Sequence, residues 1–155
     1  MELLQEGDTF QASGNYKGCV EIYSRIIELR PNFAKAYFGG GYSYTNLGDH
    51  FQAIRDYDKV IELEPKFAMA YVNRGGEYER LGNHYQGIQD FNRAMELEPR
   101  NAGAYSNRGA AYEKLGHHRQ AIRDYSRAIE LEPKEAVAYY SRGLLDFRLS
   151  SVNRV

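Results

Sequence analysis

The chain has little of what secreted and membrane-spanning proteins depend on. It contains one cysteine in 155 residues, so no intrachain disulfide can form, and a reducing compartment is the natural expectation. No apolar run approaches the roughly 18 residues that a membrane-spanning helix needs. The first residues, MELLQEGD, lack the basic and apolar regions of a signal peptide. These absences predict a cytoplasmic protein with no membrane partner.

An excess of charge of one sign is also missing. The chain carries 20 basic and 21 acidic residues, which are intermixed and give a net charge of −1. A nucleic-acid-binding domain needs a basic patch or stripe to neutralise phosphates. No nucleic-acid partner is therefore predicted. RNA binding by a helical repeat stays an alternative, and this charge balance counts against it.

Motifs that carry catalysis are not found either. The sequence contains no His-Glu-x-x-His zinc motif and no nucleophile elbow, and its three consecutive glycines lack the spacing of a dinucleotide fingerprint or a phosphate loop. The acidic residues are plentiful, but they recur at regular spacing on predicted helix surfaces. An enzyme is not expected, and no cofactor is predicted.

The sequence does contain one motif that recurs every 34 residues. Its four copies are YSRIIELRP, YDKVIELEP, FNRAMELEP and YSRAIELEP, and they end at Pro31, Pro65, Pro99 and Pro133. Two glycine columns and three aromatic columns keep the same period. A period between 20 and 50 residues indicates a stacked repeat array, which presents a long curved surface and no central pocket.

Each repeat is predicted to form two helices. In the fourth copy, apolar residues recur at helical spacing on both sides of Gly116, where glycine favours a helix end, and Pro133 stops the second helix. The glycine column inside the first helices, at Gly75 and Gly109, is expected to admit an aromatic ring from the paired helix. The nine expected helices span 1–12, 16–29, 34–47, 50–63, 68–81, 84–97, 102–115, 118–131 and 136–149.

The order aromatic, Gly, Tyr, Ala, aromatic and Pro resembles the tetratricopeptide repeat family. The fourth copy fits this order best, with Tyr105, Gly109, Tyr112, Ala121, Tyr125 and Pro133. The resemblance implies an all-α, right-handed superhelical solenoid of antiparallel helix pairs. We expect a single array over residues 1–149 and a tail at 150–155. The repeats span about 1–33, 34–67, 68–101 and 102–135, with a partial one at 136–149.

The resemblance also implies an interaction module that acts as a scaffold or adaptor. In this family the first helices line a concave groove that binds a peptide or helix of a partner protein. Asn73 and Asn107 are the best candidates for holding a peptide backbone, because an amide donates and accepts hydrogen bonds. The alternative is that these asparagines and the apolar groove residues only contact their neighbours. The candidate groove residues are Lys35, Phe38, Tyr42, Asn73, Arg80, Asn107, Lys114 and Tyr140.

A well-known subgroup of the family binds the acidic carboxy-terminal tails of heat-shock chaperones with a two-carboxylate clamp. The clamp uses lysine, asparagine and arginine at fixed places in three successive first helices. No register of this chain supplies a cation there. In one register the places hold Phe38, Tyr42, Asn73, Gly103 and Asn107. We therefore expect a groove for an apolar or mixed segment and not a chaperone clamp.

Arginine and aspartate form two further columns. An arginine precedes the helix glycine, and an aspartate precedes the second-helix aromatic residue. Pairing within a repeat would leave Asp56 and Arg142 alone, whereas pairing across the repeat boundary leaves no member unpaired. We predict inter-repeat ion pairs that fix the stacking register, with solvated surface charges as the alternative. The predicted pairs are Arg74–Asp56, Arg108–Asp90 and Arg142–Asp124.

Two smaller features, a run of glycines and a column of histidines, are also interpreted from the sequence. Gly39-Gly40-Gly41 is interpreted as a soft helix, with Gly40 opposite Ile22 and Gly39 exposing backbone to the groove. Equivalent residues of stacked repeats lie roughly 10 Å apart, too far to share a zinc ion, so the histidine column is interpreted as packing at helix starts. That column is His50, His84 and His118, and no metal is predicted.

The last predicted helix has no second helix to cover it. It carries Leu144, Leu145, Phe147 and Leu149, and only SSVNRV follows. Arrays usually end in a polar capping helix. Two interpretations stay open: the chain is a fragment of a longer array, or it self-assembles, for example as a homodimer through this terminal helix.

Overall fold

The computed structural model describes residues 2–134, 139 and 141–146, and all regular structure in this part of the chain is helical. Residues 141–146 are helical, and eight longer helices precede them. None of the described helices is long and apolar enough to cross a membrane. The helices are α1 (Glu2–Ala12), α2 (Tyr16–Leu29), α3 (Ala34–Leu47), α4 (His50–Leu63), α5 (Ala68–Arg80), α6 (His84–Leu97), α7 (Ala102–Lys114) and α8 (His118–Leu131).

The helix bounds confirm the predicted pattern. Each of the eight helices begins and ends within one residue of its predicted position. Gly48, Gly82 and Gly116 follow the first helices with φ of 77°, 78° and 77°, the left-handed conformation that glycine adopts without strain. Of the predicted helix at 136–149, the stretch 141–146 is described. Residue 139 is described as well, whereas Phe147 and Leu149 of the surface expected to form a homodimer lie outside the described residues.

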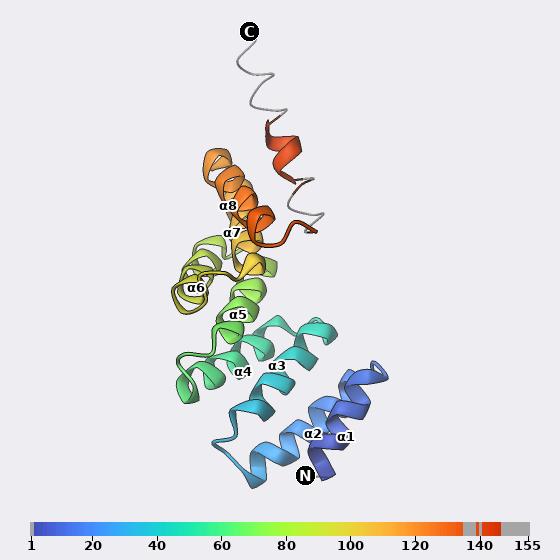
Figure 1. Cartoon of the computed structure of the whole chain (residues 1–155). Coiled ribbons are helices and arrows are strands. Elements are labelled where there is room, and N and C mark those ends of the chain that lie inside the picture. The colour runs from blue at the N-terminus through green and yellow to red at the C-terminus, as the bar shows by residue number, and fades with distance from the viewer. Residues whose placement is uncertain (1, 135–138, 140, 147–155) are drawn as a thin grey trace.

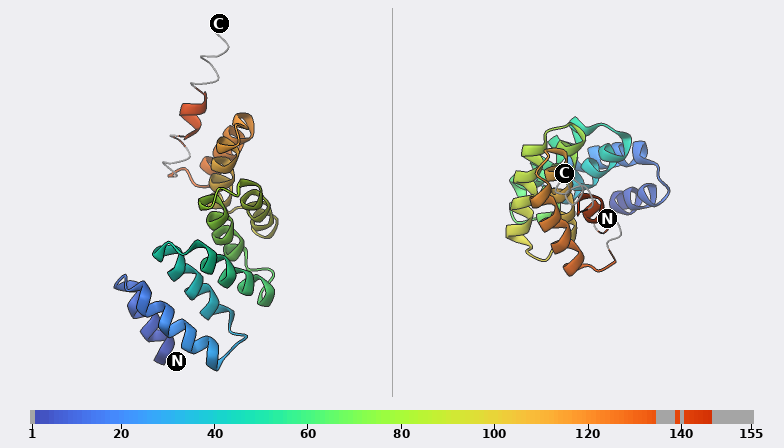
Figure 2. Two further views of the ribbon diagram at one scale, coloured as in Figure 1. Left: turned by 180° about the vertical axis from the view of Figure 1, so that it is seen from behind. Right: turned by 90° about the horizontal axis from the view of Figure 1, so that it is seen from above.

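The helix pairs stack into a superhelix. Each helix packs against the next one along the chain, and α3 also contacts α5, as α5 contacts α7. Figure 1 shows the pairs climbing from the blue α1–α2 pair to the orange α8, and the view from above in Figure 2 shows them turning about a common axis. The first helices of successive repeats therefore form one inner wall.

The hydrophobic core is distributed along this stack. One buried cluster joins α2 to α3 around Tyr23 and Ala36, and a second joins α5, α6 and α7 around Phe91 and Ala104. A third surrounds Tyr125 of α8. Because each cluster lies between neighbouring helices, the pairs bury their apolar faces on each other, as expected for a repeat array.

The glycine column admits the aromatic rings as predicted. A Cβ atom added to Gly75 would lie 2.7 Å from Cε1 of Phe91, and one added to Gly109 would lie 3.0 Å from Cδ1 of Tyr125. Real Cβ atoms essentially never approach as closely as the first distance and rarely as closely as the second, so glycine lets the two helices of each pair come this near. The predicted close approach is confirmed.

The predicted register of the arginine–aspartate pairs is wrong. Nε and Nη2 of Arg74 donate to both carboxylate oxygens of Asp90, at 2.8 and 2.6 Å. Arg108 donates to Asp124 in the same way, at 2.7 and 2.7 Å. Both pairs lie within one repeat. The reason is that Gly75 contacts Phe91 of the same helix pair. Arg74, which precedes the glycine, therefore meets Asp90, which precedes Phe91.

The arginines nevertheless bridge the repeat boundary through a different residue. Nη1 of Arg74 donates to Asp58 of α4 at 2.6 Å, and Nη1 of Arg108 donates to Asn92 of α6 at 2.6 Å. The expected link between repeats therefore exists, but its partner lies two residues after the predicted aspartate. Among the described residues, Arg142 forms no ion pair with Asp124, which Arg108 already occupies.

The three consecutive glycines each make room for a neighbouring side chain. The space beside Gly40 is filled by the carboxylate of Asp56, not by Ile22 as predicted. Gly39 lies on the groove side as predicted, where it lines a hollow, but it is largely covered by the ring of Tyr23. Its carbonyl accepts a hydrogen bond from Oγ of Ser43 at 2.7 Å. α3 therefore stays a continuous helix despite its three glycines.

Candidate functional site

Two adjoining hollows lie on the inner wall. The N-terminal hollow, about 400 Å³, lies between α1, α3 and α5. The central hollow, about 450 Å³, is formed mainly by α3, α5 and α7. Tyr42 and Asn73 line both hollows, so the two are parts of one surface, which we call the inner groove.

The predicted groove residues gather on this surface. The N-terminal hollow includes Lys35, Phe38, Tyr42 and Asn73. Tyr42 and Asn73 recur in the central hollow, together with the remaining predicted residues that the structure describes, which are Arg80, Asn107 and Lys114. Asn107 and Lys114 also line a further hollow of about 490 Å³ beside Ser106 and Tyr125. Tyr140 lies outside the described residues.

The aromatic residues of the groove are only partly free. Phe38 is half-buried, and its ring centroid lies 5.9 Å from that of Tyr57 and 5.0 Å from that of Phe67. Tyr42 is 36% exposed and meets Tyr16 edge-on at 6.3 Å. Phe38 thus both packs against its neighbours and lines the hollow, whereas Tyr42 presents its ring to the groove.

The two groove asparagines differ in their surroundings. Nδ2 of Asn73 lies 3.4 Å from the hydroxyl oxygen of Tyr57, to which it donates. Burial raises the pKa of Tyr57 to about 12, so this hydroxyl stays protonated at neutral pH. Asn107 is exposed, and its side chain makes no hydrogen bond within the described part of the chain. Asn107 therefore lines the groove with no hydrogen bond from its amide to a described residue, whereas Asn73 uses one of its amide hydrogens on Tyr57.

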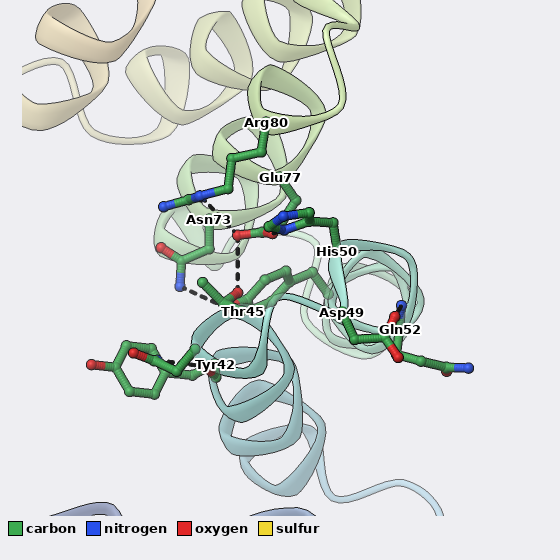
Figure 3. A network of polar contacts seen from close by, with 10 residues as sticks. Tyr42, Thr45, Asp49, His50, Gln52, Asn73, Glu77 and Arg80 are labelled. Carbon is green, nitrogen blue, oxygen red and sulfur yellow. Dashed lines mark hydrogen bonds and ion pairs between the residues drawn. The ribbon is translucent and has the colours of Figure 1, made fainter. Parts of the chain in front are cut away.

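A buried carboxylate lies beneath the central hollow (Figure 3). Glu77 of α5 is 1% exposed, and its Oε1 accepts hydrogen bonds from Thr45 and Arg80, both at 2.9 Å. Nδ1 of His50 lies 2.7 Å from its other oxygen. A buried charge is costly unless it is paired and hydrogen-bonded, and these three partners meet that need. Glu77 in turn holds the guanidinium group of Arg80 beside the groove.

Sequence reasoning missed Glu77, although a signal was present. The equivalent residue of the first copy is the exposed Thr9, and those of the other copies are Ser43, Ala111 and Leu145, which are buried and uncharged. A carboxylate in a column of small and apolar residues stands out there. Its role depends on the meeting of three helices, because α3 supplies Thr45, α4 supplies His50, and α5 supplies both Glu77 and Arg80.

Two cations stand at the rim of the central hollow. The side chains of Arg80 and Lys114 are 52% and 56% exposed. Arg80 is held by Glu77, while Nζ of Lys114 lies 3.9 Å from Oε2 of Glu79, at the outer limit of an ion pair. That Glu79 oxygen also lies 3.0 Å from Nδ1 of His84. The rim therefore offers two positive charges that a ligand can reach.

Family models match three parts of the chain. Models described as tetratricopeptide repeat match residues 34–67 and 102–135, and one described as TPR repeat matches residues 77–116. No curated protein sequence matches the chain.

Solved structures extend this similarity to the three-dimensional fold. A crystal structure of MamA is 28% identical, with a TM-score of 0.85 over 90% of this chain and 81% of that one. The first TPR of Spaghetti (RPAP3), bound to an HSP90 peptide, is 31% identical, with a TM-score of 0.74 over 76% and 93% of the two chains. The first TPR domain of human RPAP3 is also 31% identical, with a TM-score of 0.75 over 80% and 98%. These matches agree with the 34-residue period and the paired helices, and the chain belongs to the tetratricopeptide repeat family.

Proposed function

We propose that the chain is a non-enzymatic interaction module that binds an extended peptide or a helix of a partner protein in the inner groove. The observation that carries this proposal is the continuity of the two hollows. Tyr42 and Asn73 belong to both, so one ligand segment can run across α3, α5 and α7. A groove of this kind suits a scaffold or adaptor, whose task is to hold another chain.

The two ends of the groove differ in chemistry, which defines the ligand we expect. The N-terminal hollow offers the apolar surfaces of Phe38, Tyr42 and Met69, the last of them 43% exposed. The central hollow offers the exposed cations Arg80 and Lys114. We expect a segment that places an apolar side chain in the first hollow and a carboxylate at the rim of the second.

This ligand differs from a chaperone tail held by a two-carboxylate clamp. One structurally similar TPR domain is solved with the HSP90 peptide SRMEEVD. At the places where the clamp needs cations, no register of this chain has a lysine or arginine. Phe38 and Gly103, for example, occupy two such places. Arg80 and Lys114 lie about two to three helical turns further along their helices. We therefore propose that SRMEEVD binds weakly or not at all.

The proposal can be tested with peptides selected from a random library against the wild-type chain. The affinity of a selected peptide is then measured for wild type and for an Asn73→Ala/Asn107→Ala variant. Each lost hydrogen bond is worth about 0.5–1.5 kcal/mol, so we expect the double variant to bind about tenfold more weakly. Tyr42→Ala should weaken binding as well, because it removes the ring shared by both hollows.

Tyr85→Ala is the matched control. Tyr85 of α6 is 68% exposed and lines neither hollow. Its removal should leave the affinity unchanged. Equal affinity of the wild type and the double asparagine variant would remove these asparagines from the site, and loss of binding with Tyr85→Ala would place the ligand on another surface.

A further inference from the structure

Arg74 fills a slot that can be described group by group. Its guanidinium group is held by both carboxylate oxygens of Asp90 and by Asp58 at 2.6 Å. The guanidinium carbon also lies 5.7 Å and 6.0 Å from the ring centroids of Tyr71 and Tyr78. The slot thus has a carboxylate floor, two aromatic walls and a second acceptor from the preceding repeat.

Arg108 fills the same slot one repeat later. Asp124 forms the floor with two hydrogen bonds, and Asn92 supplies the second acceptor at 2.6 Å. The guanidinium carbon lies 5.8 Å from the ring centroid of Tyr105 and 5.7 Å from that of Tyr112. Two independent copies therefore define what this slot binds, which is a planar cation.

The α3–α4 pair carries the same slot without an arginine of its own. The equivalent positions hold Asp56, Tyr37, Tyr44 and Ser24, but the position of the arginine is Gly40. We call these four side chains the Asp56 slot. Tyr37 is oriented like its counterpart, because its hydroxyl donates to the carbonyl of Pro31 at 3.0 Å, just as Tyr71 donates to Pro65 at 3.1 Å.

Asp56 differs from Asp90 and Asp124 in that no arginine is paired with it in the described part of the chain. Among the described residues it forms neither a hydrogen bond nor an ion pair, and its carboxylate lies against the backbone of Gly40. Asp90 and Asp124, covered by their arginines, are 6% and 4% exposed, whereas Asp56 is only half-buried. The missing side chain at residue 40 therefore leaves this carboxylate within reach from outside.

The Asp56 slot and the inner groove are separate surfaces. Successive residues turn by about 100° around a helix axis, so Tyr37, Gly40 and Tyr44 lie on the side of α3 roughly opposite to Phe38 and Tyr42. None of the four residues of the Asp56 slot lines the N-terminal or the central hollow. A ligand at Asp56 can therefore bind while the groove is occupied.

We propose that the Asp56 slot binds the guanidinium group of an arginine side chain from a partner protein. The chain's own arginines show the required geometry, in which Nε and Nη2 each donate to one carboxylate oxygen. Arginine presents this planar fork, and it stacks between aromatic rings, whereas a lysine ammonium does neither. An arginine of the partner would take the place beside Asp56 that Arg74 and Arg108 take beside Asp90 and Asp124.

Charge favours the same ligand. Burial raises the pKa of Asp56 from 3.8 to about 7, because no cation offsets the loss of water. The charge of Asp56 in turn contributes, after burial, to the raised pKa of Tyr44, which places the two groups side by side. A bound guanidinium group stabilises the ionised carboxylate, so binding should strengthen as the pH rises through the pKa of Asp56.

The test uses Nα-acetyl-arginine amide as the probe and NMR of the wild-type chain as the readout. At a pH well above the pKa of Asp56, we expect saturable shifts of the Asp56 carboxyl carbon and of the Gly40 amide. Nα-acetyl-citrulline amide, the neutral analogue, and Nα-acetyl-lysine amide should each bind about tenfold more weakly, because neither makes the paired charged hydrogen bonds.

Two variants assign the effect to the slot. Asp56→Asn should lower the affinity for the arginine probe about tenfold, because it removes the charge. Gly40→Arg should abolish probe binding, because the chain then fills its own slot, and its melting temperature should rise above that of wild type. Gly76→Arg is the matched control. It adds the same charge to a helix glycine of α5, outside the slot, and should leave probe binding unchanged.

Several outcomes would overturn the proposal. They are the absence of saturable shifts, equal binding of the arginine and citrulline probes, and unchanged arginine binding by Asp56→Asn. If Gly40→Arg fails to fold, because its Cβ meets the carboxylate of Asp56, the comparison of Asp56→Asn with wild type decides alone. The groove peptides selected above should bind Asp56→Asn as they bind wild type, so failure here is distinguishable from failure of the proposed function.

Discussion

Asp56 and Asp90 occupy equivalent positions in successive repeats, yet only Asp90 has a cation beside it. Burial raises the pKa of both, but the guanidinium group of Arg74 opposes that rise only at Asp90. One substitution, glycine for arginine at residue 40, causes this difference. The charge environment of each aspartate is therefore set by the residue that faces it from the first helix of the same pair.

The raised pKa of Asp56 predicts how stability depends on pH. The folded state holds a proton on Asp56 up to about pH 7, whereas the unfolded state releases it near 3.8, so the folded state binds more protons in this range. The free energy of unfolding should therefore fall as the pH rises from about 4 to 7. Tyr44, its titratable neighbour on α3, has a raised pKa and stays neutral there.

Asp56→Asn should remove this fall in the free energy of unfolding with rising pH. Above pH 7 the variant should exceed wild type in its free energy of unfolding by at least about 1 kcal/mol, since one pKa unit corresponds to 1.36 kcal/mol. Below about pH 4 the two should be equal. Urea unfolding over a pH series measures the difference, and Glu62→Gln, which changes an exposed carboxylate, is the control. A parallel pH dependence of wild type and Asp56→Asn would contradict the assignment.

At the scale of an element, α3 differs from the other first helices in its three consecutive glycines. Each glycine inside a helix costs about 1 kcal/mol relative to alanine. The neighbouring side chains of Tyr23, Asp56 and Tyr57 fill the space that the glycines leave. These contacts keep α3 helical, but they do not change the low helix propensity of the three glycines.

We predict that amide hydrogens in the middle of α3 exchange faster with solvent than their equivalents in α5 and α7. Gly40→Ala should slow this exchange, because only the movable carboxylate of Asp56 lies in its way. Gly41→Ala should destabilise the helix instead, since its Cβ would lie 2.8 Å from the ring of Tyr57. Exchange measured by NMR decides the matter, and equal rates in the three helices would refute a soft α3.

At the scale of the whole molecule, the stability of an array depends on the contacts between neighbouring repeats. Glu77 is one such contact, because this buried carboxylate of α5 binds Thr45 of α3 and His50 of α4. Arg74 makes another between α5 and Asp58 of α4. Both tie the second repeat to the third.

Glu77→Ala should loosen this boundary. Alanine fits without a clash, as Ala111 occupies the equivalent buried position in the next repeat. We expect the free energy of unfolding to fall by about 1–3 kcal/mol, with the residues before α5 unfolding at lower denaturant concentration than those after it. Site-resolved hydrogen exchange in urea measures both effects. Arg127→Ala, which removes an exposed pair with Glu130 inside α8, should change neither.

The sequence by itself determined the repeat, the helix bounds and the faces of the helices. The 34-residue period places the breaks at Gly48, Gly82 and Gly116, and helical spacing places Tyr42, Asn73 and Asn107 on one side of their helices. These are local properties, because the angular position of a residue depends only on its own helix. The groove surface could therefore be predicted, apart from the degree to which Phe38 packs against its neighbours.

Only the tertiary structure decided which helix each face meets. Pairing Arg74 with Asp56 or with Asp90 satisfies the same spacing, and the sequence-based choice rested on leaving no charge alone. The close contact of Gly75 with Phe91 selects Asp90 and leaves Asp56 without an arginine. Glu77 likewise gained its partners only when three helices converged. Periodicity gives the direction of a side chain, whereas the packing of helices gives its neighbours.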